Sequence, residues 1–386
     1  MKINQLTYYD KKIGWHLDPI QFSDLNLLVG ISGVGKTQIL KSIMNMRAIA
    51  RGRSLNGAMW DVEFSINNNT YQWQGEFEHN THKLFPIPTS EELDNKFRIL
   101  TEHLYLNNHI IIERDSTQIN FKGNKLPKLS SFTSAISILS EEEDIYPVTE
   151  GFNRIYEREQ SKSDYNLFDD IYHTPTNLIV NYDYYENLAN QNCDLETIQE
   201  SHLPIQMKLG LAYKHKFSVF QEIKQQFINM FEHVEDIKVE PDKNETIPKV
   251  ISEYPLVEIK EKGVNMWIKQ NQISSGMFKT LMHISELYLS ADGTIILIDE
   301  FENSLGVNCI DILTDLLIQR KLQFIITSHH PYIINKIDME HWKIITRKGS
   351  VVTAKQVKEF NFPKSRHQAF MQLINLDAYR EGIAVG

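Results

Sequence analysis

The chain has 386 residues, 41% hydrophobic and 23% charged, which is enough for two or three domains with sizeable cores. It contains no apolar run of about 18 residues and no apolar signal core near Met1, which excludes a membrane span and a secretory leader. Its two cysteines, Cys193 and Cys309, exclude a disulfide framework and a cysteine-based zinc site, so we expect a cytoplasmic protein.

The formal net charge is −10. Proteins that coat nucleic acid usually carry a basic surplus, because they neutralise phosphates. The acidic balance therefore does not support nucleic acid as a constant partner, although it leaves room for a local basic groove.

The first thirty residues predict two or three strands that lead into a phosphate-binding loop. Residues 30–37 fit the pattern G-x-x-x-x-G-K-[ST], with a buried strand before them at 25–29 and helical spacing after them. Glycines let such a loop turn its N–H groups towards phosphate, and the helix adds its positive N-terminal end. Lys36 is expected to reach the β- and γ-phosphates of ATP, and the Thr37 hydroxyl to bind Mg²⁺. The predicted nucleotide-binding residues here are Gly30, Ser32, Gly33, Val34, Gly35, Lys36, Thr37 and Gln38.

Two aromatic residues in these first strands, Tyr8 and Trp15, have the size to stack on an adenine. Packing in the core is the more common role of such residues, and we favour it for both.

Alternating strand patterns follow the P-loop helix, where repeated βαβ units would show helical spacing instead. Hairpins are predicted at 59–76 and 109–127. Residues 129–157 are expected to be helical, 158–205 to form a polar insertion, 206–230 to form one long helix, and 247–269 to return to strands.

A second helix start appears at Ile273–Met277, where Ser274, Ser275 and Gly276 precede an apolar helical face. Free N–H groups, small hydroxyls and the helix dipole make this a second candidate anion site. One chain cannot readily direct both helix starts at the same phosphate, so a second copy of the chain is expected to supply the other.

The apolar strand at 294–298 ends in Asp299 and Glu300. A carboxylate at a strand end is suited to hold Mg²⁺ through water, and the next one to orient and deprotonate the attacking water. We predict these roles for Asp299 and Glu300 respectively.

A further buried strand at 323–327 leads to His329, which is predicted to bond the γ-phosphate and to sense its loss. A hairpin at 342–353 and a terminal helix near 364–380 are expected to complete the chain.

The order of these motifs resembles the ABC-type ATPase heads of the SMC, RecF and OLD lineages. Asp-Glu-Phe-Glu-Asn-Ser-Leu from Asp299 is similar to the Asp-Glu-Pro-Glu-Asn-Ser-Leu of OLD-like ATPases, and Thr-Ser-His-His-Pro to their Thr-Thr-His-Ser-Pro. The resemblance implies an α/β fold with a mixed central sheet, an antiparallel β-subdomain and a helical insertion. It also implies a signature at Ser274–Met277 and a D-loop at Ser304–Gly306.

The chain departs from the pattern in three places. Phe301 replaces the usual proline, Gly306 stands where many members have Asp or His, and Ser134 is only a weak substitute for the Q-loop glutamine. The predicted domains are an N-terminal ATPase lobe (1–128), a mostly helical insertion suited to partner docking (129–245) and a C-terminal ATPase lobe (246–386).

About fifty-five residues follow His329, which is too few for the TOPRIM nuclease domain of full OLD nucleases. The chain is therefore similar to the stand-alone ATPases of bacterial anti-phage systems such as Septu, PARIS and some retron systems. That resemblance implies a homodimer or higher oligomer that controls a separate nuclease or toxin.

Two alternatives stay open. An SMC- or RecF-like DNA-repair ATPase would show heptad arms or a basic face, and the sequence has no sustained heptads. The nucleotide-binding subunit of a transporter is a shorter ABC module, without the long insertion and the hairpins found here.

Overall fold

The chain folds into two compact units, seen in a computed structural model that describes residues 1–80, 96–158, 176–241, 253–303, 307–360, 362–363 and 365–382. Unit 1 comprises Met1–Arg158, Gly293–Phe301 and Lys321–Gly386. Unit 2 comprises Glu159–Asp292 and Glu302–Arg320. The division at 1–128, 129–245 and 246–386 stays a prediction.

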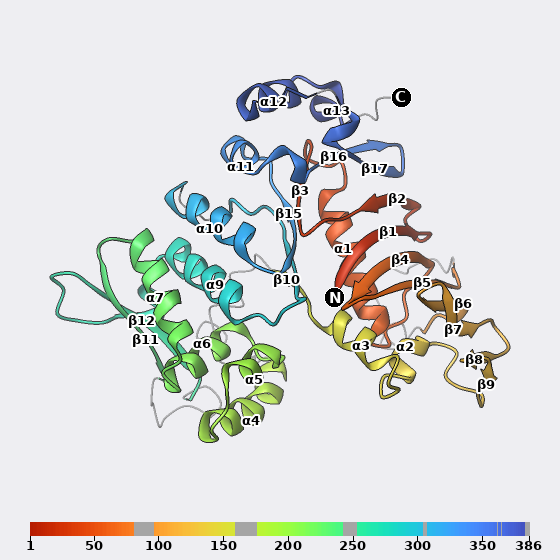
Figure 1. Cartoon of the computed structure of the whole chain (residues 1–386), viewed down its shortest axis with the longest axis horizontal. Helices are drawn as coiled ribbons and strands as arrows, with labels where there is room; N and C mark the ends of the chain where they lie inside the picture. Colours follow the sequence, from red (N-terminus) through yellow and green to blue (C-terminus); the bar gives the residue numbers. More distant parts are fainter. Residues whose placement is uncertain are drawn as a thin grey trace, which may run out of the picture. The chain divides into compact units, whose positions relative to one another are not determined.

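Unit 1 is built on a mixed sheet, which has 14 strands among the described residues (Figure 1). The strands lie in the order β10 (Ile155–Arg158), β14 (Ile295–Ile298), β15 (Gln323–Thr327), β3 (Leu25–Val29), β16 (Trp342–Lys348), β17 (Val351–Gln356), β2 (Trp15–Gln21), β1 (Lys2–Asp10), β4 (Ala58–Ile66), β5 (Asn69–Phe77), β6 (Ile99–Leu106), β7 (His109–Arg114), β8 (Ile119–Phe121) and β9 (Asn124–Lys125).

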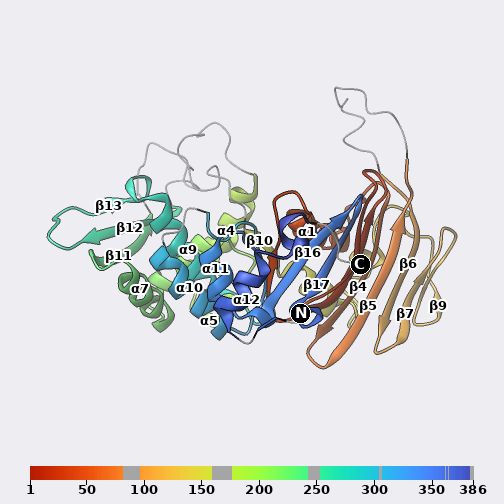
Figure 2. The ribbon, with the colours of Figure 1, turned by 90° about the horizontal axis from the view of Figure 1, so that it is seen from above.

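The strands from β10 to β16 are mutually parallel, whereas those from β2 to β9 pair antiparallel. In the parallel part β14, β3 and β15 are buried along their whole length, as apolar strands covered on both faces should be. Figure 2 shows β4, β5, β6, β7 and β9 following one another across this part of the sheet in chain order. The predicted hairpins at 59–76, 109–127 and 342–353 are confirmed.

The helices of unit 1 are short except for the one after the P-loop. They are α1 (Lys36–Ala50), α2 (Ala135–Ile138), α3 (Tyr146–Asn153), α11 (Pro331–Lys336), α12 (Arg366–Leu373) and α13 (Asp377–Arg380), with 3₁₀ turns η4 (Met339–His341) and η5 (Val357–Glu359). Helix α1 packs against α2, α3, β10 and β15. The expectation that 129–157 is helical is wrong at its end, because Ile155–Arg158 form strand β10 beside β14.

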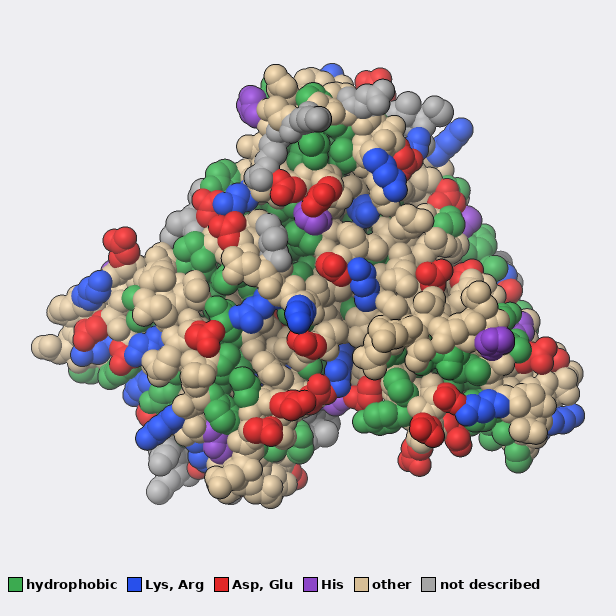
Figure 3. All heavy atoms as spheres, in the orientation of Figure 1, with side chains coloured by type: hydrophobic (Ala, Val, Ile, Leu, Met, Phe, Trp, Pro, Cys, Tyr) green, Lys and Arg blue, Asp and Glu red, His purple; other side chains and the backbone are tan. Residues whose placement is uncertain are grey.

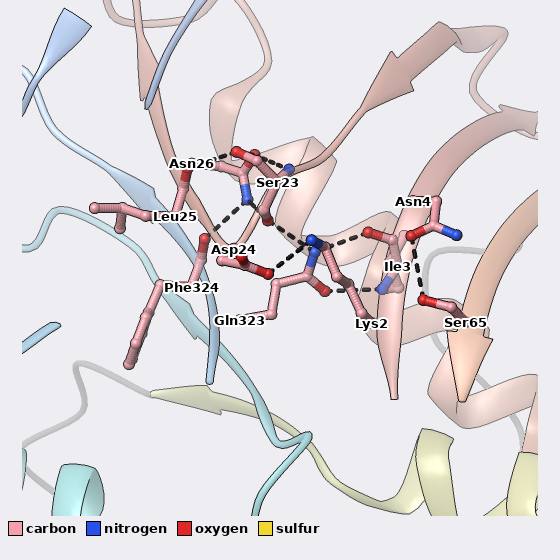
Figure 4. A network of polar contacts seen from close by, with 10 residues as sticks. All are labelled: Lys2, Ile3, Asn4, Ser23, Asp24, Leu25, Asn26, Ser65, Gln323 and Phe324. Atoms are coloured by element: carbon pink, nitrogen blue, oxygen red, sulfur yellow. Dashed lines mark hydrogen bonds and ion pairs between the residues drawn. The ribbon is translucent and has the colours of Figure 1, made fainter. Parts of the chain in front are cut away.

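A buried polar network ties together three strands of the sheet at Gln323, the first residue of β15 (Figure 4). The Gln323 amide accepts from the N–H of Ile3 at 2.8 Å and donates to the carbonyls of Ile3 and Ser23 at 2.8 and 3.0 Å. Beside it, the Asn26 amide donates to the carbonyls of Ser23 and Phe324 at 2.7 and 3.0 Å. These amides satisfy backbone groups that would otherwise be buried unpaired. The network thus fixes β1, β3 and β15 at the end opposite to the P-loop.

Unit 2 contains a three-stranded antiparallel sheet and several helices among its described residues. The strands are β11 (Val234–Pro241), β12 (Pro255–Glu261) and β13 (Ile268–Lys269). The helices are α4 (Thr176–Asn190), α5 (Leu195–Glu200), α6 (Ile205–Lys214), α7 (Ser218–Met230), α9 (Ser275–Leu289) and α10 (Val307–Gln319), with the 3₁₀ turn η3 (Gln270–Gln272). Helix α9 packs against α6, α7 and α10.

The single helix predicted at 206–230 is wrong, because the chain turns between α6 and α7. Lys216 takes a left-handed conformation with φ 57°. Its N–H donates to Tyr213 O, and the N–H of Phe217 donates to Ala212 O, both at 3.1 Å. This pattern satisfies the last carbonyls of α6 and ends it. Glycine is the usual residue at such a stop, so the lysine here gave no signal of it.

Two surface properties bear on partners. On the face shown in Figure 3, Lys and Arg side chains are interspersed with Asp and Glu, without a continuous basic patch among the described residues. No helix in the described part of the chain is long and apolar enough to span a membrane.

Candidate functional site

The predicted P-loop, residues 30–37, joins β3 to α1 in unit 1. Gly30, Gly33 and Gly35 all have positive φ, at 153°, 86° and 110°. Gly35 caps α1, so the loop ends where the N–H groups of the first helical turn have no partner within the helix. This strand–loop–helix arrangement confirms the local structure predicted from the sequence.

The shape of the loop depends on close contacts with the β16–β17 hairpin. A Cβ on Gly30 would lie 2.7 Å from the carbonyl oxygen of Ile345, and one on Gly35 would lie 2.8 Å from Val352 Cγ2. Only glycine fits at these two positions, because both the space and the backbone angle exclude a side chain.

A segment at the end of α13 also packs on the loop, which the sequence did not reveal. A Cβ on Gly382 would lie 2.5 Å from Val34 Cγ1. The Gly382 carbonyl accepts a hydrogen bond of 2.6 Å from the N–H of Arg347 in β16. Val34 itself is 4% exposed and belongs to the core, so its side chain supports the loop from within.

Lys36 is the first residue of α1, and its side chain folds over the P-loop. Its ammonium donates to the carbonyls of Gly30 and Ile31 at 2.6 and 2.9 Å. The positive charge of Lys36 therefore lies against the backbone at the start of the loop. Ser32 and Gly33, further along the loop, are exposed.

Asp299 follows β14 and meets the P-loop helix. Its Oδ2 accepts a hydrogen bond of 2.9 Å from the Thr37 hydroxyl, and its Oδ1 accepts one of 2.5 Å from the Thr327 hydroxyl at the end of β15. The structure thus brings together the two residues predicted to bind metal.

Glu300 is exposed and has a left-handed backbone, with φ 48°. This conformation costs a residue with a side chain about 1–2 kcal/mol, so its surroundings must hold it. The N–H of Glu300 donates to the Thr327 hydroxyl at 2.7 Å, and the N–H of Phe301 donates to the Thr327 carbonyl at 3.0 Å. Phe301 stands where OLD-like ATPases have proline. Its ring is buried, with 2% exposed, and its backbone N–H donates a hydrogen bond that proline could not make.

Thr327 was missed as a functional candidate. The one signal for it was its place at the end of an apolar strand, where the Thr-Ser-His-His stretch begins.

His329 and His330 differ in their surroundings, although they are adjacent. His330 caps α11, where its Nδ1 accepts from the N–H of Tyr332 at 3.2 Å. His329 is exposed beyond β15 in unit 1, the unit that also holds the P-loop and Asp299. Its role as γ-phosphate sensor stays a prediction.

The signature residues belong to unit 2. Ser274 caps α9 by accepting a hydrogen bond of 3.2 Å from the N–H of Met277, and Ser274 and Ser275 are exposed. Gly276 lies in the first turn of the same helix and is half-buried. That these three residues bind a nucleotide remains a prediction.

Two other predicted motifs are the D-loop and the Q-loop substitute. The D-loop residues Ser304–Gly306 lie outside the described residues. Ser134 is fully buried, and its hydroxyl caps α2 by accepting a hydrogen bond of 3.2 Å from the N–H of Ile136. The same hydroxyl donates to the Glu102 carboxylate at 2.5 Å, so Ser134 is a poor substitute for the Q-loop glutamine.

The two early aromatics are core residues, as favoured from the sequence. Trp15 is 4% exposed and Tyr8 is 2% exposed. The Tyr8 hydroxyl accepts from the Asn45 amide of α1 at 2.9 Å, and burial raises the pKa of that hydroxyl.

One protein-family model, described as "AAA domain, putative AbiEii toxin, Type IV TA system", matches residues 25–335. The chain belongs to this family. The match begins at β3 and includes the P-loop, Asp299 and His329, so the family model covers the predicted site in this AAA-domain protein. No curated protein matches the chain significantly.

Among solved structures, the chain is similar to an SMC head bound to the C-winged helix domain of ScpA. The TM-score is 0.52 at 13% identity, over 92% of this chain and 97% of that one. An SMC head domain from Thermotoga maritima matches with a TM-score of 0.43 and 14% identity, over 92% and 99% of the two chains. At such identity the first of these shows the fold alone: this AAA-domain protein has the ABC-type P-loop ATPase fold.

The residues present fit a magnesium ion bound with nucleotide. Thr37 and Asp299 offer a hydroxyl and a carboxylate in mutual contact, and Mg²⁺ prefers oxygen ligands from one or two protein groups together with phosphate. Among the described residues no group of three or more His, Cys, Asp or Glu side chains forms a separate metal site.

Proposed function

We propose that this chain is an ATPase that hydrolyses ATP to ADP and phosphate, dimerises head-to-tail around ATP–Mg²⁺, and controls a separate effector in bacterial anti-phage defence. The ABC-type fold supports nucleotide binding. The hydrogen bond of 2.9 Å between Thr37 and Asp299 carries the proposal, because it joins the P-loop helix to the carboxylate strand at one point.

The proposed roles follow from position. Loop N–H groups between Gly30 and Thr37 bind phosphate oxygens, and the Lys36 ammonium exchanges its two carbonyl partners for the β- and γ-phosphates. Thr37 and Asp299 would hold Mg²⁺, which when bound neutralises developing charge on the phosphates.

Glu300 supplies the general base of the proposed reaction. It is exposed, follows Asp299 directly, and would take a proton from the attacking water. His329 would bond the γ-phosphate and lose that bond after hydrolysis.

The second copy of the chain would present Ser274, Ser275 and Gly276 to the same ATP. Their exposed helix start in unit 2 offers backbone N–H groups to an anion. ATP would then favour the dimer by binding both copies, and hydrolysis would loosen it, which is a ligand-dependent population shift.

The proposed control of an effector draws on the family description. The family description names a toxin and a type IV TA system, which agrees with a role in a system that contains a toxic component. The effector is proposed to be a separate nuclease or toxin.

The test uses Glu300→Gln in the full-length protein, with Glu113→Gln as matched control, since Glu113 lies exposed in β7 away from the site. With ATP and Mg²⁺, Glu300→Gln is expected to form a stable dimer in light scattering and to release no phosphate. The control should release phosphate as the wild type does. Undiminished phosphate release by Glu300→Gln would refute the role of Glu300.

A role as an SMC- or RecF-like DNA ATPase is the alternative outcome. It predicts that DNA alone stimulates phosphate release and that the stimulation falls steeply with salt. An effect of this kind would replace the defence proposal while leaving the ATPase site as described.

A further inference from the structure

Thr327 contacts three successive residues at the end of β14. Its hydroxyl donates to Asp299 Oδ1 at 2.5 Å and accepts from the N–H of Glu300 at 2.7 Å. Its carbonyl accepts from the N–H of Phe301 at 3.0 Å. Thr327 therefore hydrogen-bonds Asp299, the candidate metal ligand, Glu300, the candidate general base, and Phe301.

The position of Thr327 is rigid. It is fully buried at the end of β15, where it pairs with Leu28 of β3, and β15 also pairs with β14. A β-branched side chain in a buried strand has little rotamer freedom, so the direction of the hydroxyl is set by the fold.

The two oxygens of Asp299 are thereby given different partners. Thr327 bonds Oδ1 and Thr37 bonds Oδ2, so Oδ2 is the oxygen turned towards the P-loop helix. Groups that hydrogen-bond a metal-binding carboxylate orient it and strengthen metal binding.

The same hydroxyl bears on the conformation of Glu300. A left-handed conformation of a non-glycine residue is strained and persists only when its surroundings hold it, and the hydrogen bond from the Glu300 N–H to the Thr327 hydroxyl is one such contact. Loss of the hydroxyl would free the backbone that aims the Glu300 side chain.

We propose that Thr327 is a positioning residue of the ATPase site, which fixes the oxygen that Asp299 presents to Mg²⁺ and holds Glu300 in its left-handed conformation. This inference rests on the proposed function. Thr327 acts through Asp299 and Glu300 and does not itself touch ATP.

The deciding variant is Thr327→Val, which keeps the shape of the side chain and replaces the hydroxyl by a methyl group. Thr327→Ser restores a hydroxyl. Thr327→Ala removes it without placing a methyl group against the carboxylate, and serves if the valine variant does not fold. Thr314→Val is the matched control, because Thr314 is also fully buried and loses a hydroxyl that bonds only Ile310 O, at 2.7 Å in α10.

The measurement is the binding of a fluorescent ATP analogue by the full-length protein, first in EDTA and then during titration with Mg²⁺. For Thr327→Val and Thr327→Ala we expect unchanged binding in EDTA. The Mg²⁺ concentration for half-maximal response should rise by about 10–100-fold, the usual effect of losing such a supporting group. Thr327→Ser and Thr314→Val should stay close to the wild type.

A structural role alone would lower the unfolding temperature and leave the Mg²⁺ response unchanged, and that result would overturn the inference. A serine variant shifted as far as the valine variant would also overturn it. Failure of the wild type to bind the analogue at any Mg²⁺ concentration would instead refute the proposed function itself.

Discussion

The hydroxyl of Thr37 lies 2.9 Å from Oδ2 of Asp299, although 262 positions separate the two residues in the sequence. Parallel pairing of β14, β15 and β3 accounts for this meeting. The carboxyl ends of parallel strands share one edge of the sheet, and the P-loop, Asp299 and His329 all follow such ends.

Replacement of Asp299 by asparagine should separate metal binding from folding. The amide keeps the shape of the side chain and removes the charge, so the Mg²⁺-dependent part of ATP binding should fall by at least about tenfold. The unfolding temperature should not fall, because active-site carboxylates are commonly kept for function at a cost in stability. Titration calorimetry with and without Mg²⁺ measures the first effect. Asp61→Asn, in β4, is the control, and an equal loss in that variant would contradict the prediction.

Gly35→Ala should strain the P-loop through a contact with Val352 and through the positive φ at this position. The new methyl group would meet Val352 Cγ2 at 2.8 Å at a backbone angle of φ 110°, and crowding of this kind costs about 1–3 kcal/mol. Denaturant unfolding measures the decrease in the free energy of unfolding. Gly123→Ala is the comparison, since Gly123 has φ 76° and no atom within 4 Å of a Cβ.

The double variant Gly35→Ala, Val352→Ala should regain part of the free energy of unfolding lost in Gly35→Ala. The alanine at position 352 is shorter than valine and makes room for the new methyl group. If the double variant is as unstable as the sum of the single ones, the contact with Val352 is not the cause.

The buried ion pair between Glu102 and Arg114 should be costly to break on one side. Glu102 is fully buried and also accepts from Trp73 Nε1 at 3.1 Å and from the N–H of Ala135 at 2.8 Å. Arg114→Met leaves that carboxylate without its counter-charge, which should lower the free energy of unfolding by about 3–5 kcal/mol.

A double-mutant cycle with Glu102→Leu checks this interpretation. The double variant should be less unstable than the sum of the two single changes, because no uncompensated buried charge remains. Strict additivity in denaturant unfolding would show that the two side chains do not act as a pair.

Lys343 in β16 should destabilise the fold at neutral pH. Burial, and secondarily the charge of Lys358, lowers the pKa of the Lys343 ammonium. The folded state therefore binds this proton less tightly than the unfolded state does, and stability rises with pH between the lowered pKa and the ordinary lysine value. Below the lowered pKa both states hold the proton, and the destabilisation caused by the buried ammonium is fully present.

Lys343→Met keeps most of the apolar stem and should raise the free energy of unfolding at pH 7 by up to about 1 kcal/mol, after allowance for solvent screening. The gain should shrink as the pH approaches 10.5, the ordinary pKa of lysine. Unfolding curves at pH 7 and near pH 10 measure both effects. A gain that grows with pH would contradict the assignment.

The sequence predicted those features that depend on local pattern. The P-loop, the apolar strand before Asp299 and the hairpins each follow from a few adjacent residues, and the structure has them where expected. The pairing of Thr37 with Asp299 followed from the combination of two such motifs.

Features without a recognisable sequence motif were not predicted. β10 has only four residues and becomes a strand by pairing with β14. The break at Lys216 uses a left-handed lysine, a choice that sequence pattern does not reveal. Thr327 is one threonine among many until the fold places it against Asp299 and Glu300.

Unit 2 is made of two separate segments of the chain, 159–292 and 302–320. The segment between them, Gly293–Phe301, belongs to unit 1 and carries Asp299 and Glu300. A minimal nucleotide-binding core therefore cannot be obtained by trimming either terminus or by excising one segment. It requires two simultaneous splices, one joining 158 to 293 and one joining 301 to 321, and the second lies directly beside the proposed general base.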